Sequence, residues 1–509
     1  MSTKVPPAPL RLGRGSDDVP LALSAAEFRA AGHRLVDRIA ELLVSLPARP
    51  VTPGEGPEAV RNKLRASASL PWKAQEASAV LEEATELLIE NSLHNGHPSF
   101  FGYITSSPAP IGMLGDLLSA ALNPNLGAWT LSPMATEIES QTIRWISELI
   151  GYPSDCGGLL VSGGNMGNWV GLLAAHAPAG SAWKVRESGM NAPGARHFSV
   201  YVSGEAHTWL QKASDLSGIG TNAIRWIETN DHLRMNVDAL RTAITRDRAD
   251  GFEPLIVVGT AGSVSTGAVD PLPALANICR QEKIWFHVDG AYGGFAAVVP
   301  EAPEEIRGLA ETDSVAVDPH KWLYSPLEAG CVLVQRAGAL REAFSYHPPY
   351  YYFGVEATNY VDFGPQNSRG FRALKVWLGL RQAGREGCQR MISQDIGLAR
   401  RLHDNVSKQE ELEPIIQGLS ISVFRYRPTE LLEKVGDPAT ETYLDQLNQR
   451  IQDRLEKTGT AFVSNAVIRG RYALRACIVN FNTTVEDVDA LPRVIATLGR
   501  ELHEASQSP

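Results

Sequence analysis

A lysine at the end of an expected strand is the first residue whose surroundings indicate chemistry. In the segment SVAVDPHKWLY, the β-branched residues that begin at Ser314 give way to Asp318, His320 and Lys321. An amine beside apolar groups such as Trp322 favours its uncharged form, a nucleophile that can condense with an aldehyde. Most lysines are solvated at the surface, so this hypothesis needs support from other motifs.

A second expected strand, in the segment IWFHVDGAYGG, ends with the carboxylate of an aspartate. Asp289 stands at its end, and Ala291 and several glycines follow, which would let a flat ring approach the backbone. A carboxylate at this place needs a compensating partner, and the protonated ring nitrogen of pyridoxal phosphate (PLP) is one such group. The alternative is an aspartate that caps the next turn.

A glycine-rich turn joins a third strand to a helix in GGLLVSGGNMGNWVGLLAAH. Gly163, Gly164 and Asn165 would expose backbone N–H groups at the start of that helix, a setting that holds phosphate groups. The turn lacks both the Gly-Lys-Ser/Thr ending of a P-loop and the Gly-x-Gly-x-x-Gly spacing of a dinucleotide site. Many such turns are rich in glycine for steric reasons alone.

Two further strand ends carry polar side chains, namely His207 after SVYVSGEA and the pair Thr260 and Ser263 in GTAGSVSTG. An imidazole there can stack on a flat cofactor and bond a substrate carboxylate. A lone histidine is more often a structural residue. Because all of these features follow strands of one expected sheet, their convergence favours a cofactor site.

The motifs lie on alternating strands and helices. Short β-branched runs predict strands at 159–161, 199–202, 255–258, 284–288 and 314–317, and helical segments follow at 165–176 and 273–281. This alternation predicts an α/β fold with a mostly parallel sheet, which binds ligands at the carboxyl ends of its strands.

The two ends of the chain differ from this central pattern. Amphipathic helices at 28–42 and 80–91 have little core of their own, so they would pack on a second subunit or back on their own. Beyond about residue 382 an α+β tail is expected. It would have a helix at 392–408, strands at 420–426, 461–464 and 472–479, and a last helix opened by a capping box of Thr484 and Asp487.

Composition excludes several classes of protein. The 509 residues carry a net charge of -10 without a basic block, which argues against nucleic acid or anionic lipid as the main partner. The five cysteines are scattered, so neither a disulfide framework nor a metal site is expected. No apolar run is long enough to cross a membrane. A cytoplasmic protein that acts on small molecules is the resulting expectation.

The motif HVDGAYGG followed by PHKW resembles the PLP-dependent group II amino acid decarboxylases, such as the aromatic amino acid, tyrosine, histidine and glutamate decarboxylases. The likeness extends through HPSFFGY at 97–103, SPMATE at 132–137 and NSRGFRALKVW at 367–377, and covers nearly the whole chain. It implies the aspartate aminotransferase-like fold of PLP enzymes (fold type I). It also implies a homodimer with an N-terminal wrapping segment (1–95), a PLP-binding domain (96–381) and a small C-terminal domain (382–509).

The resemblance implies a role for each motif. Lys321 would hold PLP covalently, with His320 beside it, and Asp289 would pair with the pyridine nitrogen. Ala291 would lie under the ring, opposite His207. The phosphate would be held by Gly163, Gly164, Asn165 and Ser263. In the segment SYHPPYYYFG, Tyr350 matches the catalytic loop tyrosine of the family, with Tyr351 and Tyr352 as the alternatives.

The expected substrate is an aromatic L-amino acid. Tyr103, Ile104, Thr105 and Trp129 would form apolar and aromatic walls, and no arginine stands out as a clamp for a distal carboxylate. Decarboxylation to the amine and CO2 is therefore the leading hypothesis. An aldehyde-forming synthase, in which Phe typically replaces the loop tyrosine, and a non-catalytic dimer of the same fold are the alternatives. Tyrosine at 350 favours the amine.

Overall fold

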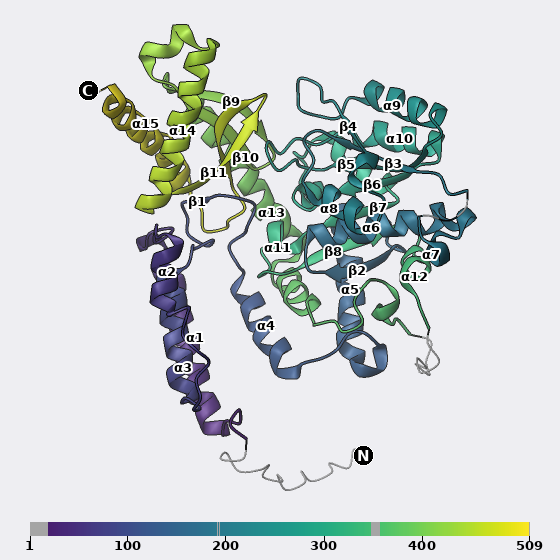
Figure 1. Ribbon diagram of the computed structural model, residues 1–509. Coiled ribbons are helices and arrows are strands. Elements are labelled where there is room, and N and C mark those ends of the chain that lie inside the picture. The colour runs from purple at the N-terminus through teal and green to yellow at the C-terminus, as the bar shows by residue number, and fades with distance from the viewer. Residues whose placement is uncertain (1–18, 191, 193, 348–356, 508–509) are drawn as a thin grey trace. The chain divides into compact units, whose positions relative to one another are not determined.

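The computed structural model describes residues 19–507 apart from 191, 193 and 348–356, so Tyr350, Tyr351 and Tyr352 lie outside the described part. The chain forms two compact units, one of residues 1–94 with 456–460 and one of residues 95–455 with 461–509 (Figure 1). The division into three domains expected from the sequence stays a prediction.

The first unit is helical. It contains α1 (Ala25–Ser45), α2 (Pro57–Leu64) and α3 (Ala77–Asn91), and α1 contacts α3. Helix α1 begins with a capping box in which Ser24 and Glu27 satisfy each other's backbone N–H groups. None of the residues of α1 is buried. The two helices expected here are present, and α2 is an additional one.

The second unit contains a seven-stranded sheet in the order β2-β8-β7-β6-β5-β3-β4. Its strands are β2 (Gly157–Val161), β3 (Phe198–Ser203), β4 (Ile224–Ile227), β5 (Glu253–Thr260), β6 (Trp285–Asp289), β7 (Ser314–Val317) and β8 (Gly330–Val334). Only β8 runs against its neighbours in this sheet. The prediction of a mostly parallel sheet is confirmed.

Helices bury both faces of this sheet. Val258 of β5 packs in a cluster with α6 (Gly164–Ala179) and α8 (Trp209–Leu216). Its neighbour Val257 belongs to the larger cluster that includes α5 (Pro133–Ile150), α9 (Val237–Ala249) and α10 (Leu272–Glu282). Successive strand residues therefore face opposite apolar layers, which explains their continuous β-branched character.

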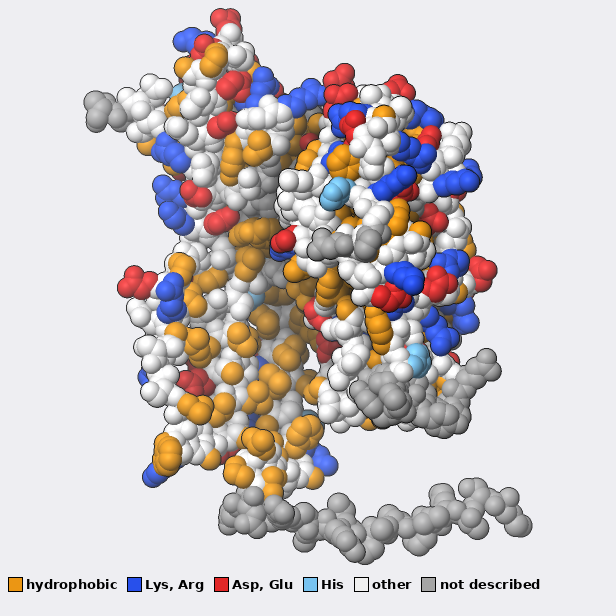
Figure 2. All heavy atoms as spheres, turned by 45° about the vertical axis from the view of Figure 1, so that its right-hand side comes forward, with side chains coloured by type: hydrophobic (Ala, Val, Ile, Leu, Met, Phe, Trp, Pro, Cys, Tyr) orange, Lys and Arg blue, Asp and Glu red, His pale blue; other side chains and the backbone are white. Residues whose placement is uncertain are grey.

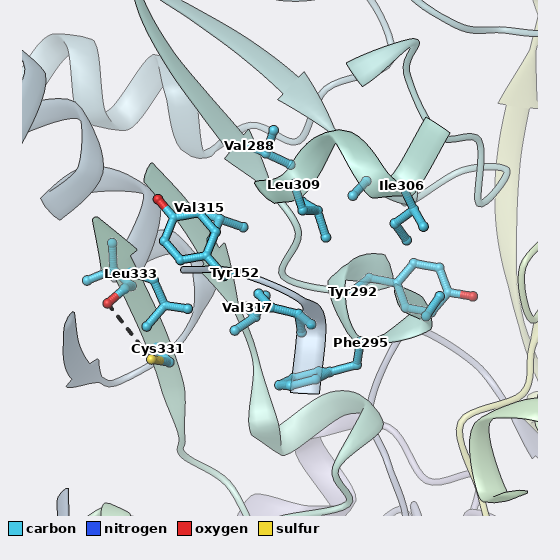
Figure 3. Packing of buried hydrophobic residues seen from close by; sticks show 14 of the residues in the cluster. Tyr152, Val288, Tyr292, Phe295, Ile306, Leu309, Val315, Val317, Cys331 and Leu333 are labelled. Carbon is cyan, nitrogen blue, oxygen red and sulfur yellow. Dashed lines mark hydrogen bonds between the residues drawn. The ribbon is translucent and has the colours of Figure 1, made fainter. Parts of the chain in front are cut away.

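The larger cluster packs directly behind the strand ends. Figure 3 shows Val288 of β6 with Val315 and Val317 of β7 and, across from them, Leu309 and Phe295. All of these side chains are almost completely buried. Dense packing of this kind holds the ends of β6 and β7 in place, because side chains in a full core have little room to shift.

A second sheet of five strands has the order β1-β11-β12-β10-β9. Its strands are β1 (Phe100–Phe101), β9 (Leu412–Gly418), β10 (Ile421–Tyr426), β11 (Phe462–Ile468) and β12 (Arg471–Cys477), and it is accompanied by α14 (Pro438–Thr458) and α15 (Val485–Gln507). Strand β1 pairs with β11 in parallel. The capping box of Thr484 and Asp487 is present at the start of α15.

Shorter elements complete the chain. They are η1 (Leu46–Ala48), α4 (Pro110–Leu122), η2 (Trp129–Leu131), η3 (Ser181–Trp183), α7 (Val185–Ser188), η4 (Thr221–Ala223), η5 (Gly293–Val298), η6 (Glu304–Glu311), α11 (Pro319–Trp322), α12 (Ala339–Phe344), η7 (Tyr360–Asp362) and η8 (Thr429–Lys434). Among the described residues, no helix is long and apolar enough to cross a membrane, and no His, Cys, Asp and Glu side chains cluster as metal ligands.

Helix α13 (Ala373–Ser407) carries a buried carboxylate to the back of the segment that contains Lys321. The helix kinks at Gly384, and beyond the kink Asp395 is 2% exposed. One oxygen of Asp395 accepts hydrogen bonds from Trp322 Nε1 at 2.9 Å and from the Tyr324 hydroxyl at 2.7 Å. Burial raises the pKa of Asp395 from its usual 3.8 to about 7.

The raised pKa of Asp395 predicts a specific dependence of stability on pH. Between about pH 4 and pH 7 the unfolded chain has lost the proton that the folded chain keeps, so stability falls as pH rises through this range. The Asp395→Asn variant exchanges no proton there. We expect the free energy of unfolding of the wild type, relative to the variant, to fall by roughly 2–4 kcal/mol across this range. Denaturant titrations that give the same difference at every pH would contradict the assignment.

Candidate active site

A cavity of about 450 Å³ lies in the second unit, where carboxyl ends of the parallel strands meet. Its lining includes Lys321, Asp289, His207, Asn165, Thr260 and Arg475. This volume is in the range of sites that bury a small molecule. Most residues that the sequence singled out for chemistry therefore surround one space.

Lys321 lies in the short helix α11, directly after β7. Its Nζ is 3.1 Å from Oδ2 of Asp318, whose carboxylate is almost completely buried. The sequence predicted apolar surroundings for this amine, and the structure instead places a negative charge beside it. The second oxygen of Asp318 has no hydrogen-bond partner within the described residues.

The residues that follow Lys321 hold it in place. Trp322 and Tyr324 donate to Asp395, and the Trp322 indole stacks on the ring of Tyr292 with centroids 4.8 Å apart. Tyr292 in turn shares a hydrogen bond of 2.7 Å with the hydroxyl of Ser420. The segment that contains Lys321 is thus held by hydrogen bonds to Asp395 of α13 and, through Tyr292, by a contact with Ser420 between β9 and β10.

Asp289 ends β6 and is 9% exposed, at the wall of the cavity. Its Oδ1 accepts a hydrogen bond of 3.2 Å from the backbone N–H of Ala291, which also lines the cavity. The space beside Ala291 is tight, because a Cβ on Gly164 would come within 2.7 Å of its methyl group. Small residues are thus required where the strand end and the glycine turn approach each other.

The start of α6 forms another side of the cavity. Gly163 precedes the helix at φ 145°, a conformation that favours glycine, and no side chain of the described residues caps the helix. Gly164 and Asn165 line the cavity, whereas Gly163 lies behind it, next to the ring of His320. The first N–H groups of α6 are therefore free to bind an anion such as phosphate.

His207 and Thr260 complete the polar lining. The Nδ1 atom of His207 accepts a hydrogen bond of 3.3 Å from the backbone N–H of Trp209. The Nε2 atom of His207 is therefore left for a ligand in the cavity. Thr260 ends β5, and its buried hydroxyl has no partner in the described part of the chain. An unsatisfied buried hydroxyl is costly unless a ligand supplies the missing partner.

Besides Gly163, three further residues expected at the site do not line the cavity. Ser263 is buried and shares a hydrogen bond of 2.7 Å with Thr266. The Nδ1 atom of His320 lies 2.7 Å from the carbonyl oxygen of Ala329. Trp129 donates its indole N–H to Glu137 at 2.8 Å. Their proposed functional roles stay predictions, and Tyr350 lies outside the described residues.

The expected substrate wall is brought to the cavity by the second sheet. Tyr103, Ile104 and Thr105 line the cavity just after β1. The backbone N–H of Tyr103 donates to Ser464 Oγ at 2.6 Å, and its carbonyl accepts from Arg475 Nη1 at 3.1 Å. Because β1 pairs with β11, this wall is fixed by strands that lie far away in the sequence.

Arg475 is the most important residue that sequence reasoning missed. It is 3% exposed, lines the cavity from β12, and keeps Nε and Nη2 without a partner among the described residues. No local motif marks it, because it is one residue of a strand in the tail. Asp318 and Asn168 were missed as well. Asp318 was at least detectable, since it stands three residues before Lys321.

These groups fit PLP. The uncapped start of α6 would hold its phosphate, Asp289 would pair with the ring nitrogen, and Lys321 would bond its aldehyde carbon. The unpartnered hydroxyl of Thr260 supplies a further polar contact. The cavity thus contains a complementary group for each functional part of the cofactor.

Comparison with known proteins agrees with this geometry. The model of the pyridoxal-dependent decarboxylase conserved domain matches residues 57–427. An aromatic-L-amino-acid decarboxylase from Bacillus atrophaeus is 31% identical over 487 residues, which are 95% of this chain and 97% of that protein.

Solved structures show the same fold. The crystal structure of Oryza sativa TDC with PLP and tryptamine has a TM-score of 0.86 and 28% identity, and covers 94% of this chain and 99% of that one. Rhodiola rosea 4-hydroxyphenylacetaldehyde synthase has a TM-score of 0.82 and 26% identity, with the same coverage of 94% and 99%. The predicted fold class is confirmed. The chain belongs to the pyridoxal-dependent decarboxylase family and is a PLP-dependent carboxy-lyase.

Proposed function

We propose that the enzyme converts an aromatic L-amino acid to the corresponding amine and CO2. The observation that carries this proposal is a single cavity lined by Lys321, Asp289 and Arg475, next to the aromatic residue Tyr103. Two guanidinium nitrogens of Arg475 have no partner among the described residues. The likeness to aromatic-L-amino-acid decarboxylase supports the choice of substrate class.

Each side chain has a defined task in this proposal. Bound PLP supplies an electron sink for the bond that breaks at the substrate Cα. Lys321 would hold the cofactor covalently through its amine. The Asp289 carboxylate would pair with the protonated ring nitrogen, and Gly163, Gly164 and Asn165 would hold the phosphate. His207 and Ala291 would contact the ring.

Arg475 is the group that we assign to the substrate carboxylate. A buried guanidinium with two unpartnered nitrogens is suited to bind a carboxylate by a forked pair of hydrogen bonds. A fixed carboxylate also fixes which Cα bond aligns with the ring π system, and this alignment selects decarboxylation. The remaining basic groups of the described lining are Lys321 and His207, so a second, distal carboxylate has no dedicated partner.

The last step returns a proton to Cα after CO2 has left. We assign this proton to the hydroxyl of Tyr350, on the family resemblance of the segment HPPYYYFG, with Tyr351 and Tyr352 as the alternatives. An aldehyde-forming activity is the second candidate function, because phenylacetaldehyde synthase from a Rosa hybrid is 28% identical over 92% of this chain. It would consume O2 and water and release CO2, aldehyde, ammonia and hydrogen peroxide in place of the amine.

We further propose that the enzyme acts as a homodimer. Phe28, Val36 and Val44 of α1 and Leu88 of α3 are exposed, and so are Leu114, Leu117, Leu118 and Leu122 of α4. Exposed apolar side chains are visible in orange in Figure 2. Each of the two units thus exposes apolar side chains of its own, and exposed apolar surface is typical of an interface. A solution mass equal to that of one chain would contradict a dimer.

A cytoplasmic location also belongs to this proposal. All five cysteines are free thiols, and four of them are buried. Thiols that persist in this form suit a reducing compartment. Secretion of the protein by its native cell would contradict the assignment.

The proposed function is tested by incubating the enzyme with each aromatic L-amino acid, histidine and glutamate, and by identifying the products by mass. We expect amines from aromatic substrates. In Arg475→Gln, kcat/KM should fall about 100-fold or more, because the substrate carboxylate loses a charged partner. Arg475→Lys should retain part of the activity. Preferred turnover of glutamate, or an Arg475→Gln enzyme with unchanged kinetics, would refute the assignment.

Lys321→Ala tests the covalent link. The variant should lose turnover by several orders of magnitude, because the nucleophile that captures the cofactor is gone. Borohydride reduction followed by peptide mapping should label Lys321 in the wild type and no lysine in the variant. Lys283 lies outside the cavity lining and serves as the matched control, since Lys283→Ala should retain turnover and labelling.

Tyr350→Phe tests the proton donor. Without the hydroxyl, return of the proton to Cα slows and leaves time for oxidation by dissolved O2, so the product should shift from the amine toward the aldehyde, ammonia and hydrogen peroxide. Tyr351→Phe and Tyr352→Phe serve as matched variants and should keep the amine product. An unchanged amine yield in Tyr350→Phe, together with a shift in either neighbour, would move the role to that neighbour.

A further inference from the structure

The amine of Lys321 has a partner of its own at the wall of the cavity. Its Nζ lies 3.1 Å from Oδ2 of Asp318, and both residues belong to the cavity lining. No other carboxylate of the described residues forms an ion pair with this amine. The side chain of Lys321 is 21% exposed, so packing alone does not fix the end of this long and flexible chain. The position of Nζ therefore depends on Asp318.

The backbone of Asp318 is held on both sides. Its N–H donates to the carbonyl oxygen of Ala291 at 3.2 Å, and its carbonyl oxygen accepts from the backbone N–H of Lys321 at 2.9 Å. Ala291 follows Asp289, the last residue of β6, by two positions and also lines the cavity. The residue that holds the amine is thus fixed relative to both Lys321 and the end of β6.

Two glycines make room for the carboxylate of Asp318. A Cβ on Gly164 would lie 2.8 Å from its Oδ2, and a Cβ on Gly330 would lie 2.8 Å from its Oδ1. Both distances are shorter than a van der Waals contact, so larger residues at these places would displace the carboxylate. Asp318 is 1% exposed. A carboxylate enclosed in this way has little room to turn away from Nζ.

His320 lies next to this ion pair but does not compete for the carboxylate. Its Nε2 is 3.7 Å from Oδ2 of Asp318, which is beyond hydrogen-bond distance. Its Nδ1 lies 2.7 Å from the carbonyl oxygen of Ala329. Burial lowers the pKa of His320 and so favours the neutral ring. The carboxylate is therefore left to the amine of Lys321.

Asp318 also lies close to the start of α6, where the phosphate of PLP would bind. An ionised carboxylate accepts hydrogen bonds but cannot donate them, and the oxygens of a phosphate dianion are acceptors as well. Two neighbouring anionic groups also repel each other. Asp318 is therefore suited to bind the amine and unsuited to bind the phosphate.

We propose that Asp318 is a positioning residue for Lys321, whose carboxylate holds Nζ in the cavity for the capture of PLP. The inference rests on the proposed role of Lys321. An amine that is already held in place has lost much of the freedom of its side chain, so the bond to the cofactor costs less entropy than it would for a freely moving lysine. Without this contact, the capture of PLP should become slower although the pocket stays intact.

The closing experiment compares two ligands of the full-length protein after removal of its cofactor. Capture of PLP is followed by the visible absorbance of the bound cofactor. In deoxypyridoxine phosphate a methyl group replaces the aldehyde, so this analogue occupies the pocket without a bond to lysine. In Asp318→Ala we expect the rate constant of PLP capture to fall at least about tenfold, whereas the dissociation constant of the analogue should stay the same or fall. Asp318→Asn keeps an acceptor oxygen without the charge and should give an intermediate rate.

Asp247→Asn is the matched control. Asp247 is 2% exposed and forms an ion pair of 2.8 Å with Arg225, outside the cavity lining. Its substitution should lower the unfolding temperature but leave the capture of PLP unchanged.

Two results would overturn the inference. One is an equal rate of capture in the wild type and in Asp318→Ala. The other is weaker binding of the analogue in proportion to the slower capture, which would mean that Asp318 shapes the pocket as a whole. If borohydride labels a residue other than Lys321 in the wild type, the proposed role of Lys321 is refuted, and the inference with it, before any Asp318 variant is compared.

Discussion

Parallel pairing of β5, β6 and β7 is the constraint on which the site depends. Because the three strands run in the same direction, Thr260, Asp289 and the residues after Val317 reach the same edge of the sheet. Both faces of these strands are covered, so a polar side chain within them is buried and needs a partner on a neighbouring element, as His287 and Ser314 have. The polar and charged residues of the site therefore lie at the strand ends. There a charged group can meet a ligand while the strands behind it remain in the apolar core.

The charges around the cavity complement a bound cofactor and substrate. Two carboxylates, Asp289 and Asp318, face two cations, Lys321 and Arg475, within one lining. Asp318 already has a partner in Lys321, whereas Arg475 retains two nitrogens without one in the described part of the chain. Buried charges are costly unless they are paired. The structure thus holds Arg475 ready for an anionic group, and the positive ring nitrogen of PLP would offset Asp289.

Much of the fold and part of the site could be predicted from the sequence. The β-branched runs identified most strands of the main sheet because both of their faces are buried, and the glycine turn and PHKW directly follow such runs. Strand β8 was missed, although GCVLV is equally apolar, because no motif accompanies it. Arg475 was missed for a different reason. Its position at the cavity results from the pairing of β10, β11 and β12, and long-range pairing leaves no local pattern.

Under the proposed function, recognition of the substrate side chain and orientation of its carboxylate would be linked through the contact between Tyr103 and Arg475. The backbone of Tyr103 is tied on one side to Ser464 and on the other to Arg475 itself. Tyr103 also adopts a left-handed conformation with φ 48°, which these two contacts help to maintain. A substrate ring that displaced Tyr103 would therefore pull on the arginine that we assign to the carboxylate. Because the angle of the carboxylate decides which Cα bond breaks, a poorly fitting side chain should impair the selection of that bond as well as binding.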